Sequence, residues 1–126
     1  MLEIRELQDI SKYSEVIKKL GENNEYRVVE SFGHEHEVTG YAVYSWSPEA
    51  VIIHDVDYGK DILLGDGILR AVLFKACLKG IECGICLACD GDTNQFEKMK
   101  YETKEPGKIS PISSFLDGCS KCKEMR

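Results

Sequence analysis

Residues 51 to 89 place a helix between two apolar strands, and this arrangement allows few folds. "AVIIHDVDYG" has the β-branched composition of a buried strand, and "ECGICLACD" reads as a second one. Between them, "ILRAVLFKACLKG" repeats apolar residues at helical spacing and ends at Gly80. Strand, helix and strand in this order form a right-handed crossover with parallel strands. The sequence therefore predicts one parallel βαβ unit.

The first fifty residues predict a strand, a helix and an antiparallel pair of strands. We expect a strand over residues 2–7 and a helix over 12–20 that begins after Ser11. "EYRVVESF" and "VTGYAVYSW" are rich in β-branched and aromatic residues, and a short polar connection joins them. These two strands should pair antiparallel and lead into the βαβ unit.

The C-terminal third predicts only short elements. "TNQFEK" is at most a turn or two of helix, "MKYETK" starts a strand, and "ISPISSFL" forms an edge strand because Pro111 cannot donate to a central ladder. The whole order predicts an α/β fold whose mixed central sheet combines an antiparallel meander with one βαβ unit, with helices on both faces. We assign this domain to residues 1–118 and treat residues 119–126 as a tail.

The stretch "ILLGDG" places two glycines, one residue apart, between the strand expected in "AVIIHDVDYG" and the long helix. With the element order, it resembles the signature of the GCN5-related N-acetyltransferases (GNAT): arginine or glutamine, two residues, glycine, one residue, then glycine or alanine. Gly65 and Gly67 match, whereas Ile62 stands at the first position. "FEKMKYE" resembles a remnant of the family's C-terminal motif, so the resemblance spans about residues 2 to 102.

This resemblance implies a protein that binds acetyl-CoA or CoA. The backbone of Asp55, Val56 and Asp57 would hold the pantetheine arm. The diphosphate would lie against the backbone of Ile62, Leu63, Leu64, Gly65, Asp66 and Gly67. Glycine allows close approach of the backbone, and amides at a helix start donate to anions. Asp61 and Asp66 would oppose the diphosphate, so a simple turn, with an acid favouring the helix dipole, is the alternative interpretation.

The implied activity is acetyl transfer from acetyl-CoA to an amine, which needs a base for the amine and an acid for the leaving thiolate. His54, Asp55 and Asp57 are the candidate bases, because they lie on the strand beside the expected cleft between residues 51–57 and 84–89. Where the family often has a tyrosine acid, this chain has Phe96, which cannot donate a proton. Tyr101 or Tyr58 would have to replace it, although each tyrosine also suits a packing role.

The net charge of −6 argues against broad contact with nucleic acid or acidic membranes. No apolar run approaches the ~20 residues of a membrane span, and the N-terminus lacks the order of a signal peptide. We therefore expect a cytoplasmic protein whose acceptor is a small-molecule or peptide amine, and the negative charge suits a cationic one. A homodimer is left open.

Two other functions compete with acetyl transfer. A non-catalytic domain that binds CoA or a partner is favoured by Phe96 and Asp66. A thiol-based metal or redox protein would use the cysteine pairs, and Cys83, Cys86, Cys119 and Cys122 would make a tetrahedral set if they met. Residues three apart on a strand face opposite sides, so we predict no metal site. Cys77, Cys86 and Cys89 are instead expected to be small buried hydrophobes.

Overall fold

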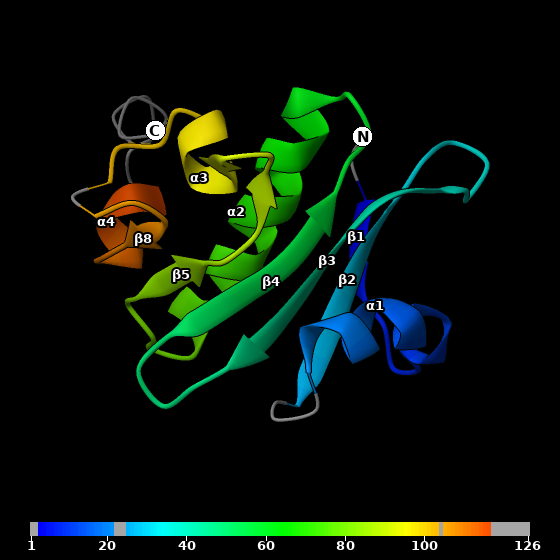
Figure 1. The fold of residues 1–126 in the computed structure, drawn as a ribbon, viewed down its shortest axis with the longest axis horizontal. Helices are drawn as coiled ribbons and strands as arrows, with labels where there is room; N and C mark the ends of the chain where they lie inside the picture. The colour runs from blue at the N-terminus through cyan, green and yellow to red at the C-terminus, as the bar shows by residue number, and fades with distance from the viewer. Residues whose placement is uncertain (1–2, 22–24, 104, 117–126) are drawn as a thin grey trace.

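A six-stranded sheet forms the centre of the chain, with the strand order β1-β2-β3-β4-β5-β8 (Figure 1). The computed structural model describes residues 3–21, 25–103 and 105–116. The strands of this sheet are β1 (Glu3–Glu6), β2 (Tyr26–Phe32), β3 (Val38–Trp46), β4 (Val51–Asp57), β5 (Gly84–Cys86) and β8 (Lys108–Ile109). A separate hairpin contains β6 (Cys89–Asp90) and β7 (Thr93–Asn94). The helices are α1 (Ser14–Leu20), α2 (Ile62–Leu78), α3 (Gln95–Lys98) and α4 (Ile112–Leu116).

The pairing of the strands confirms the predicted meander and crossover. Each of β1 to β4 pairs antiparallel with its neighbour in sequence. The α2 crossover then brings β5 beside β4 in parallel register, and β8 pairs antiparallel with β5 at the sheet edge. The fold is therefore a mixed α/β sheet with one parallel pair.

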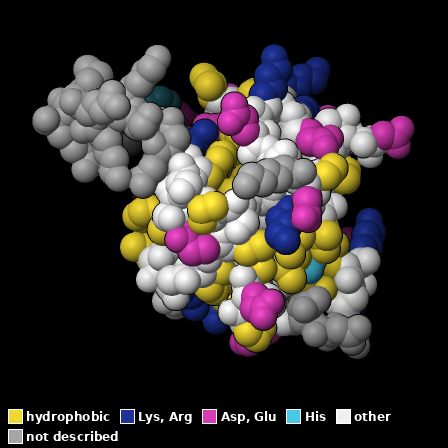
Figure 2. Space-filling model, turned by 90° about the vertical axis from the view of Figure 1, so that its left-hand side faces the viewer, with side chains coloured by type: hydrophobic (Ala, Val, Ile, Leu, Met, Phe, Trp, Pro, Cys, Tyr) yellow, Lys and Arg dark blue, Asp and Glu magenta, His cyan; other side chains and the backbone are white. Residues whose placement is uncertain are grey.

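Helices cover the two faces of the sheet unequally. In Figure 1, α1 lies in front of the sheet and α2 behind it. The larger core cluster packs the inner face of α2 against β3, β4 and β5, with Ile53, Ile68 and Leu69 fully buried. The smaller cluster packs α1 against β2 and β3, around Tyr26 and Val43. Because α1 stops short of the last strands, the front of β4 and β5 is only half-buried. Figure 2, which views the molecule from the left-hand side of Figure 1, shows hydrophobic side chains gathered on that face.

Two expectations for the C-terminal half were wrong. The strand expected across residues 82–90 is only Gly84–Cys86, and residues 101–103 form no strand. The expected edge strand in "ISPISSFL" ends at Ile109, and α4 follows. Glu82 explains this helix, because its carbonyl accepts from the Ile112 amide at 2.8 Å and its carboxylate from the Ser113 amide at 2.8 Å. An acid thirty residues away in sequence therefore caps α4.

Candidate active site

A small cleft opens where β4 and β5 part. Their register ends at Ile53 and Cys86, with one further bond from the Leu87 amide to the Ile53 carbonyl at 2.8 Å. β4 continues to Asp57, while the segment that follows β5 turns away into the β6–β7 hairpin and α3. The cleft has a volume of about 200 Å³ and is lined by Val56, Asp57, Tyr58, Gly59, Cys89, Asp90, Gln95 and Lys98.

Two contacts join the walls of this cleft. The Tyr58 hydroxyl donates to Oε1 of Gln95 at 2.7 Å. Lys98 forms an ion pair with Asp90 and lies with its Nζ 5.4 Å from the centre of the Tyr58 ring. The hydrogen bond to Asp90 raises the pKa of Lys98, so this side chain stays cationic. The cleft therefore holds a tyrosine hydroxyl, a carboxylate and an ammonium group within one small space.

Of the four catalytic candidates, Asp57 lines this cleft. Its side chain is exposed, and Oδ1 accepts from the Gly59 amide at 2.9 Å, which fixes the carboxylate at the end of β4. The resemblance drew attention to this residue, but Gln95 and Lys98 carried no sequence signal because they reach the cleft only through the turn after β5.

His54 and Asp55 lie on the face of the sheet that α1 covers. A β-bulge causes this, since Val43 pairs with Asp55 and Tyr44 with Ile53, and His54 is the extra residue. Nε2 of His54 lies 2.7 Å from Oγ of Ser45, and burial lowers the pKa of His54, so the ring is neutral near pH 7. The bulge thus overrides the alternation of faces expected along a strand.

The Asp55 carboxylate is already engaged. Oδ2 accepts a hydrogen bond from the Tyr41 hydroxyl at 2.8 Å. Burial, followed by this bond to Asp55, raises the pKa of Tyr41. Tyr41 also packs against Tyr13, with ring centres 4.7 Å apart and ring planes tilted by 47°, and the Tyr13 hydroxyl donates to Glu30, which is 2% exposed. A row of tyrosine–carboxylate pairs therefore runs across the front of the sheet toward Asp57, and sequence reasoning missed Glu30 entirely.

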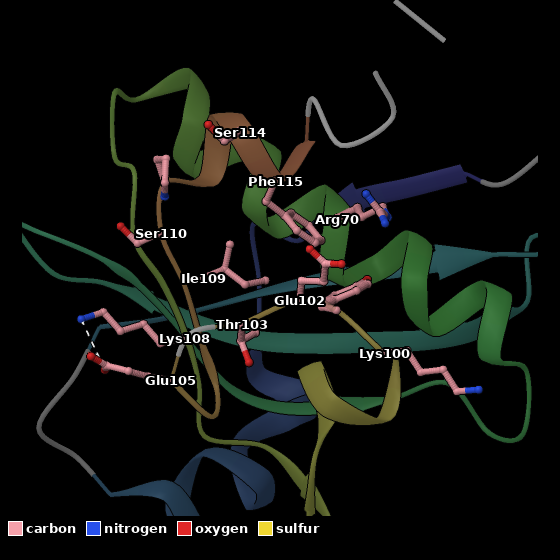
Figure 3. A pocket seen from close by; sticks show the side chains of 12 residues that line it. Arg70, Lys100, Glu102, Thr103, Glu105, Lys108, Ile109, Ser110, Ser114 and Phe115 are labelled. Atoms are coloured by element: carbon pink, nitrogen blue, oxygen red, sulfur yellow. Dashed lines mark ion pairs between the residues drawn. The ribbon is translucent and has the colours of Figure 1, made fainter. Parts of the chain in front are cut away.

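Tyr101 lies outside the cleft. Its hydroxyl donates to Asp66, and burial, more than this bond, raises its pKa. It lines a second and larger hollow of about 950 Å³, which is bordered by the segment that follows α3, by β8 and by α4 (Figure 3). In that hollow Arg70 stacks over the rings of Tyr101 and Phe115, and Lys108 pairs with Glu105. The structure therefore does not bring Tyr101 beside the three candidate bases.

The expected glycine loop is part of a helix, which corrects the position of the candidate anion site. α2 begins at Ile62, and Asp61 caps it by accepting from the Leu64 amide at 3.2 Å. The Gly65 amide donates to the Asp61 carbonyl at 3.0 Å, so it belongs to the helix and is not available to an anion. α2 starts at Ile62, six residues before the Ile68 expected from the sequence, because Asp61 provides the cap.

Gly65 has a packing role. A Cβ there would lie 2.5 Å from Cε of Met99 and 2.7 Å from Cδ1 of Tyr58. Asp66 accepts from Arg70 and Tyr101, and Leu64 and Val56 are buried in the core. The open part of the helix start is its first turn, where Ile62 is 44% and Leu63 82% exposed. The missing side chain at Gly65 lets Tyr58 lie against α2 and form the cleft wall.

The cysteines are spread over different environments. Cys86 is buried in β5, and burial raises the pKa of its thiol to about 12. Cys77 is half-buried, whereas Cys89 is exposed, which corrects its expected burial: the chain has left the sheet before it. Among the described residues, no group of three or more His, Cys, Asp or Glu is placed to hold a metal ion. Cys119 and Cys122 lie outside the described residues.

The mixed sheet with its α2 crossover matches solved acetyltransferases, one of them a member of the GNAT family, so the chain has the GNAT fold. A putative acetyltransferase from Exiguobacterium sp. 255-15 matches with a TM-score of 0.59 at 13% identity, over 94% of this chain and 98% of that chain. A GNAT-family acetyltransferase from Staphylococcus aureus Mu50 matches with a TM-score of 0.53 at 12% identity, over 80% of this chain and 79% of that chain.

The enzyme AAC(6')-Iy, in complex with a CoA-containing bisubstrate analogue, matches with a TM-score of 0.55 at 10% identity, over 83% of this chain and 93% of that chain. No protein-family model and no curated protein matches the sequence. At these identities the likeness establishes the fold. In the described part of the chain, no helix is long and apolar enough to cross a membrane.

Proposed function

We propose that this chain is an N-acetyltransferase that takes its acetyl group from acetyl-CoA and passes it to a small-molecule or peptide amine. The observation that carries the proposal is the cleft at the end of β4, where Asp57 and Tyr58 lie side by side in sequence and line the same small space. Neighbours of the same fold support it, since one of them binds a CoA-containing analogue.

The residues of the cleft fit the thioester arm of acetyl-CoA better than its diphosphate. The backbone of Asp55, Val56 and Asp57 would hold the arm, because β4 has parted from β5 by this point. The diphosphate would lie at the first turn of α2, near the amides of Ile62 and Leu63, and not at Gly65, whose amide is bonded to Asp61. Bound acetyl-CoA supplies an activated thioester.

The side chains of the cleft supply the proton transfers. A cationic acceptor must lose a proton before it can act as a nucleophile, and the exposed Asp57 carboxylate is placed to take it, directly or through water. Tyr58 lines the cleft and Tyr101 lines the other hollow, so the Tyr58 hydroxyl is the better placed donor to the leaving thiolate. Asp55 and Asp57 make this end of the sheet favourable for a cationic amine, whereas the buried Glu30 is already paired with Lys12.

A non-catalytic CoA-binding domain is the second candidate function. It is favoured by the Asp61 carboxylate at the start of α2, because this charge stands where a diphosphate would bind and the helix is capped without a ligand. The ion pair of Lys98 with Asp90 across a cleft of only about 200 Å³ favours it as well. Both candidates require CoA binding and differ in turnover.

Calorimetric titration with acetyl-CoA, followed by a thiol-release assay with a panel of cationic amines, tests both. Acetyl transfer predicts binding and release of free CoA. Tyr58→Phe should then lower kcat at least tenfold with CoA affinity within twofold, whereas Tyr101→Phe should leave kcat within twofold. Binding without release supports the second candidate. Absence of binding at millimolar acetyl-CoA would remove both.

A further inference from the structure

Helix α2 is apolar on two opposite sides. Its inner face packs into the core with Leu64, Gly65, Ile68, Leu69, Val72, Leu73 and Ala76. At about 100° per residue, the outer side brings Leu63, Gly67, Ala71, Phe74 and Leu78 into one stripe along the helix axis. Leu63 is 82%, Phe74 54% and Leu78 72% exposed. A helix that is apolar all round is typical of one buried on all sides, yet the described part of the chain leaves these three side chains more than half exposed.

The stripe is complementary to itself when a second copy runs antiparallel. A two-fold axis between Arg70 and Ala71 puts Leu63 level with the partner's Leu78. It also puts the large Phe74 ring level with the partner's Gly67, which has no side chain. Small residues near the axis let two helices approach closely, and large residues further out fill the space between them. The order of large and small side chains along the stripe therefore fits a symmetric pair of helices.

The helix dipoles select the same orientation, because an antiparallel pair places the start of each helix beside the end of its partner. The charged side chains beside the stripe already have partners within the chain: Asp66 accepts from Arg70 and Tyr101, and Lys75 forms an ion pair with Glu6. They therefore stay at the edges of the contact.

Arg70, the charged residue at the axis, is turned aside. Its guanidinium bonds Asp66 at 2.9 Å and lies 4.8 Å from the centre of the Phe115 ring. The side chain therefore leans toward α4 and leaves the centre of the stripe to Gly67 and Ala71. A cation held in this way limits the cost of placing Arg70 near an apolar contact.

We propose that the outer stripe of α2, Leu63, Gly67, Ala71, Phe74 and Leu78, is a homodimer interface in which the α2 helices of two copies pack antiparallel. The contact is isologous, so it closes at two copies. It is built largely on one helix of 17 residues, which places it at the small end of specific interfaces, and the dimer should dissociate on dilution.

Sedimentation equilibrium from micromolar to millimolar concentration tests the proposal. The full chain should pass from the mass of one copy to that of two. Phe74→Glu and Leu78→Glu should each weaken the dimer at least tenfold, because they place a charge in an apolar contact. Leu87→Glu is the matched control: Leu87 is 59% exposed on another surface, and its change should leave the dimer as it is.

Cross-linking tests the orientation. Ala71→Cys should give a disulfide-linked dimer on mild oxidation, because two copies of this position face each other across the axis. The unchanged chain and Ser14→Cys, on exposed α1, measure the background from other thiols. A single-copy mass at millimolar concentration would overturn the proposal. So would a dimer broken by Leu87→Glu and kept by Phe74→Glu with a folded circular dichroism spectrum, since another face would then be responsible.

Discussion

Gly65→Ala distinguishes a packing glycine from a glycine that serves an anion loop. If Gly65 had no packing role, a methyl group one turn into α2 should stabilise the free protein, because alanine is the better helix former by about 1 kcal/mol. In the structure, that methyl group lies 2.7 Å from Cδ1 of Tyr58 and 2.5 Å from Cε of Met99. Either contact is too close for the present arrangement to persist.

The two neighbours differ in their freedom to move. The Met99 side chain is flexible and can rotate away. The Tyr58 ring is held at its hydroxyl by Gln95 at 2.7 Å and is 4% exposed, so it can yield only by losing that bond or shifting the cleft wall. Overpacking of this kind costs about 1–3 kcal/mol, which exceeds the gain of about 1 kcal/mol from helix propensity. We expect a net loss of about 1 kcal/mol.

Urea unfolding and thermal melts measure this loss, with Gly67→Ala as the matched control. Gly67 lies in the same helix on its outer side, so the same change there should raise the free energy of unfolding by about 0.5–1 kcal/mol. The two variants should differ in Tm by roughly 5 °C, with opposite signs relative to the unchanged chain. If both variants gain stability equally, Tyr58 does not pack on Gly65 and the account of the cleft wall is wrong.

Three further changes have expected outcomes. Asp61→Asn keeps an N-cap but removes its charge, so it should strengthen CoA binding several-fold in calorimetry while stability changes by less than about 0.5 kcal/mol; a loss of affinity would contradict the opposing charge. Tyr13→Phe should cost about 1–2 kcal/mol in urea unfolding, because the buried Glu30 loses its hydroxyl donor and keeps only its ion pair with Lys12. Tyr26→Phe should cost nothing or stabilise, since the Tyr26 hydroxyl is buried without a partner among the described residues. Burial lowers the pKa of His54 in the folded state, so stability present above the unfolded pKa of about 6.5 should be lost as the pH falls through the folded pKa. His54→Gln should flatten this part of the urea midpoint profile, and an unchanged slope would refute the burial argument.

The sheet could be predicted from the sequence because strand and helix periodicities are local, and the handedness of the crossover follows from its connectivity. The start of α2 could not. "KDILLGDG" is compatible with a loop through the glycines or with a helix capped by Asp61, and the choice depends on whether Tyr58 lies against Gly65, which is a tertiary contact. The same holds for α4, whose cap is the sequence-distant Glu82.

The candidate site was predicted in part. Asp57 could be found because it ends the strand beside the crossover helix. The environments of His54 and Asp55 depend on one bulge, and nothing in "IIHDVD" indicates that β3 pairs past His54. Tyr58, Gln95 and Lys98 meet only because the chain leaves the sheet after Cys86, which the apolar run "CGICLAC" concealed.

Both outer strands of the sheet are poor templates for further strands. β1 has four residues and carries Glu3, Arg5 and Glu6, and β8 has two residues with Pro111 soon after. A long, neutral edge recruits other chains without limit through its unpaired backbone groups. Here each end of the sheet is short or charged, so growth into open-ended fibrils is disfavoured, and copies that meet must do so through side chains on a face or a helix.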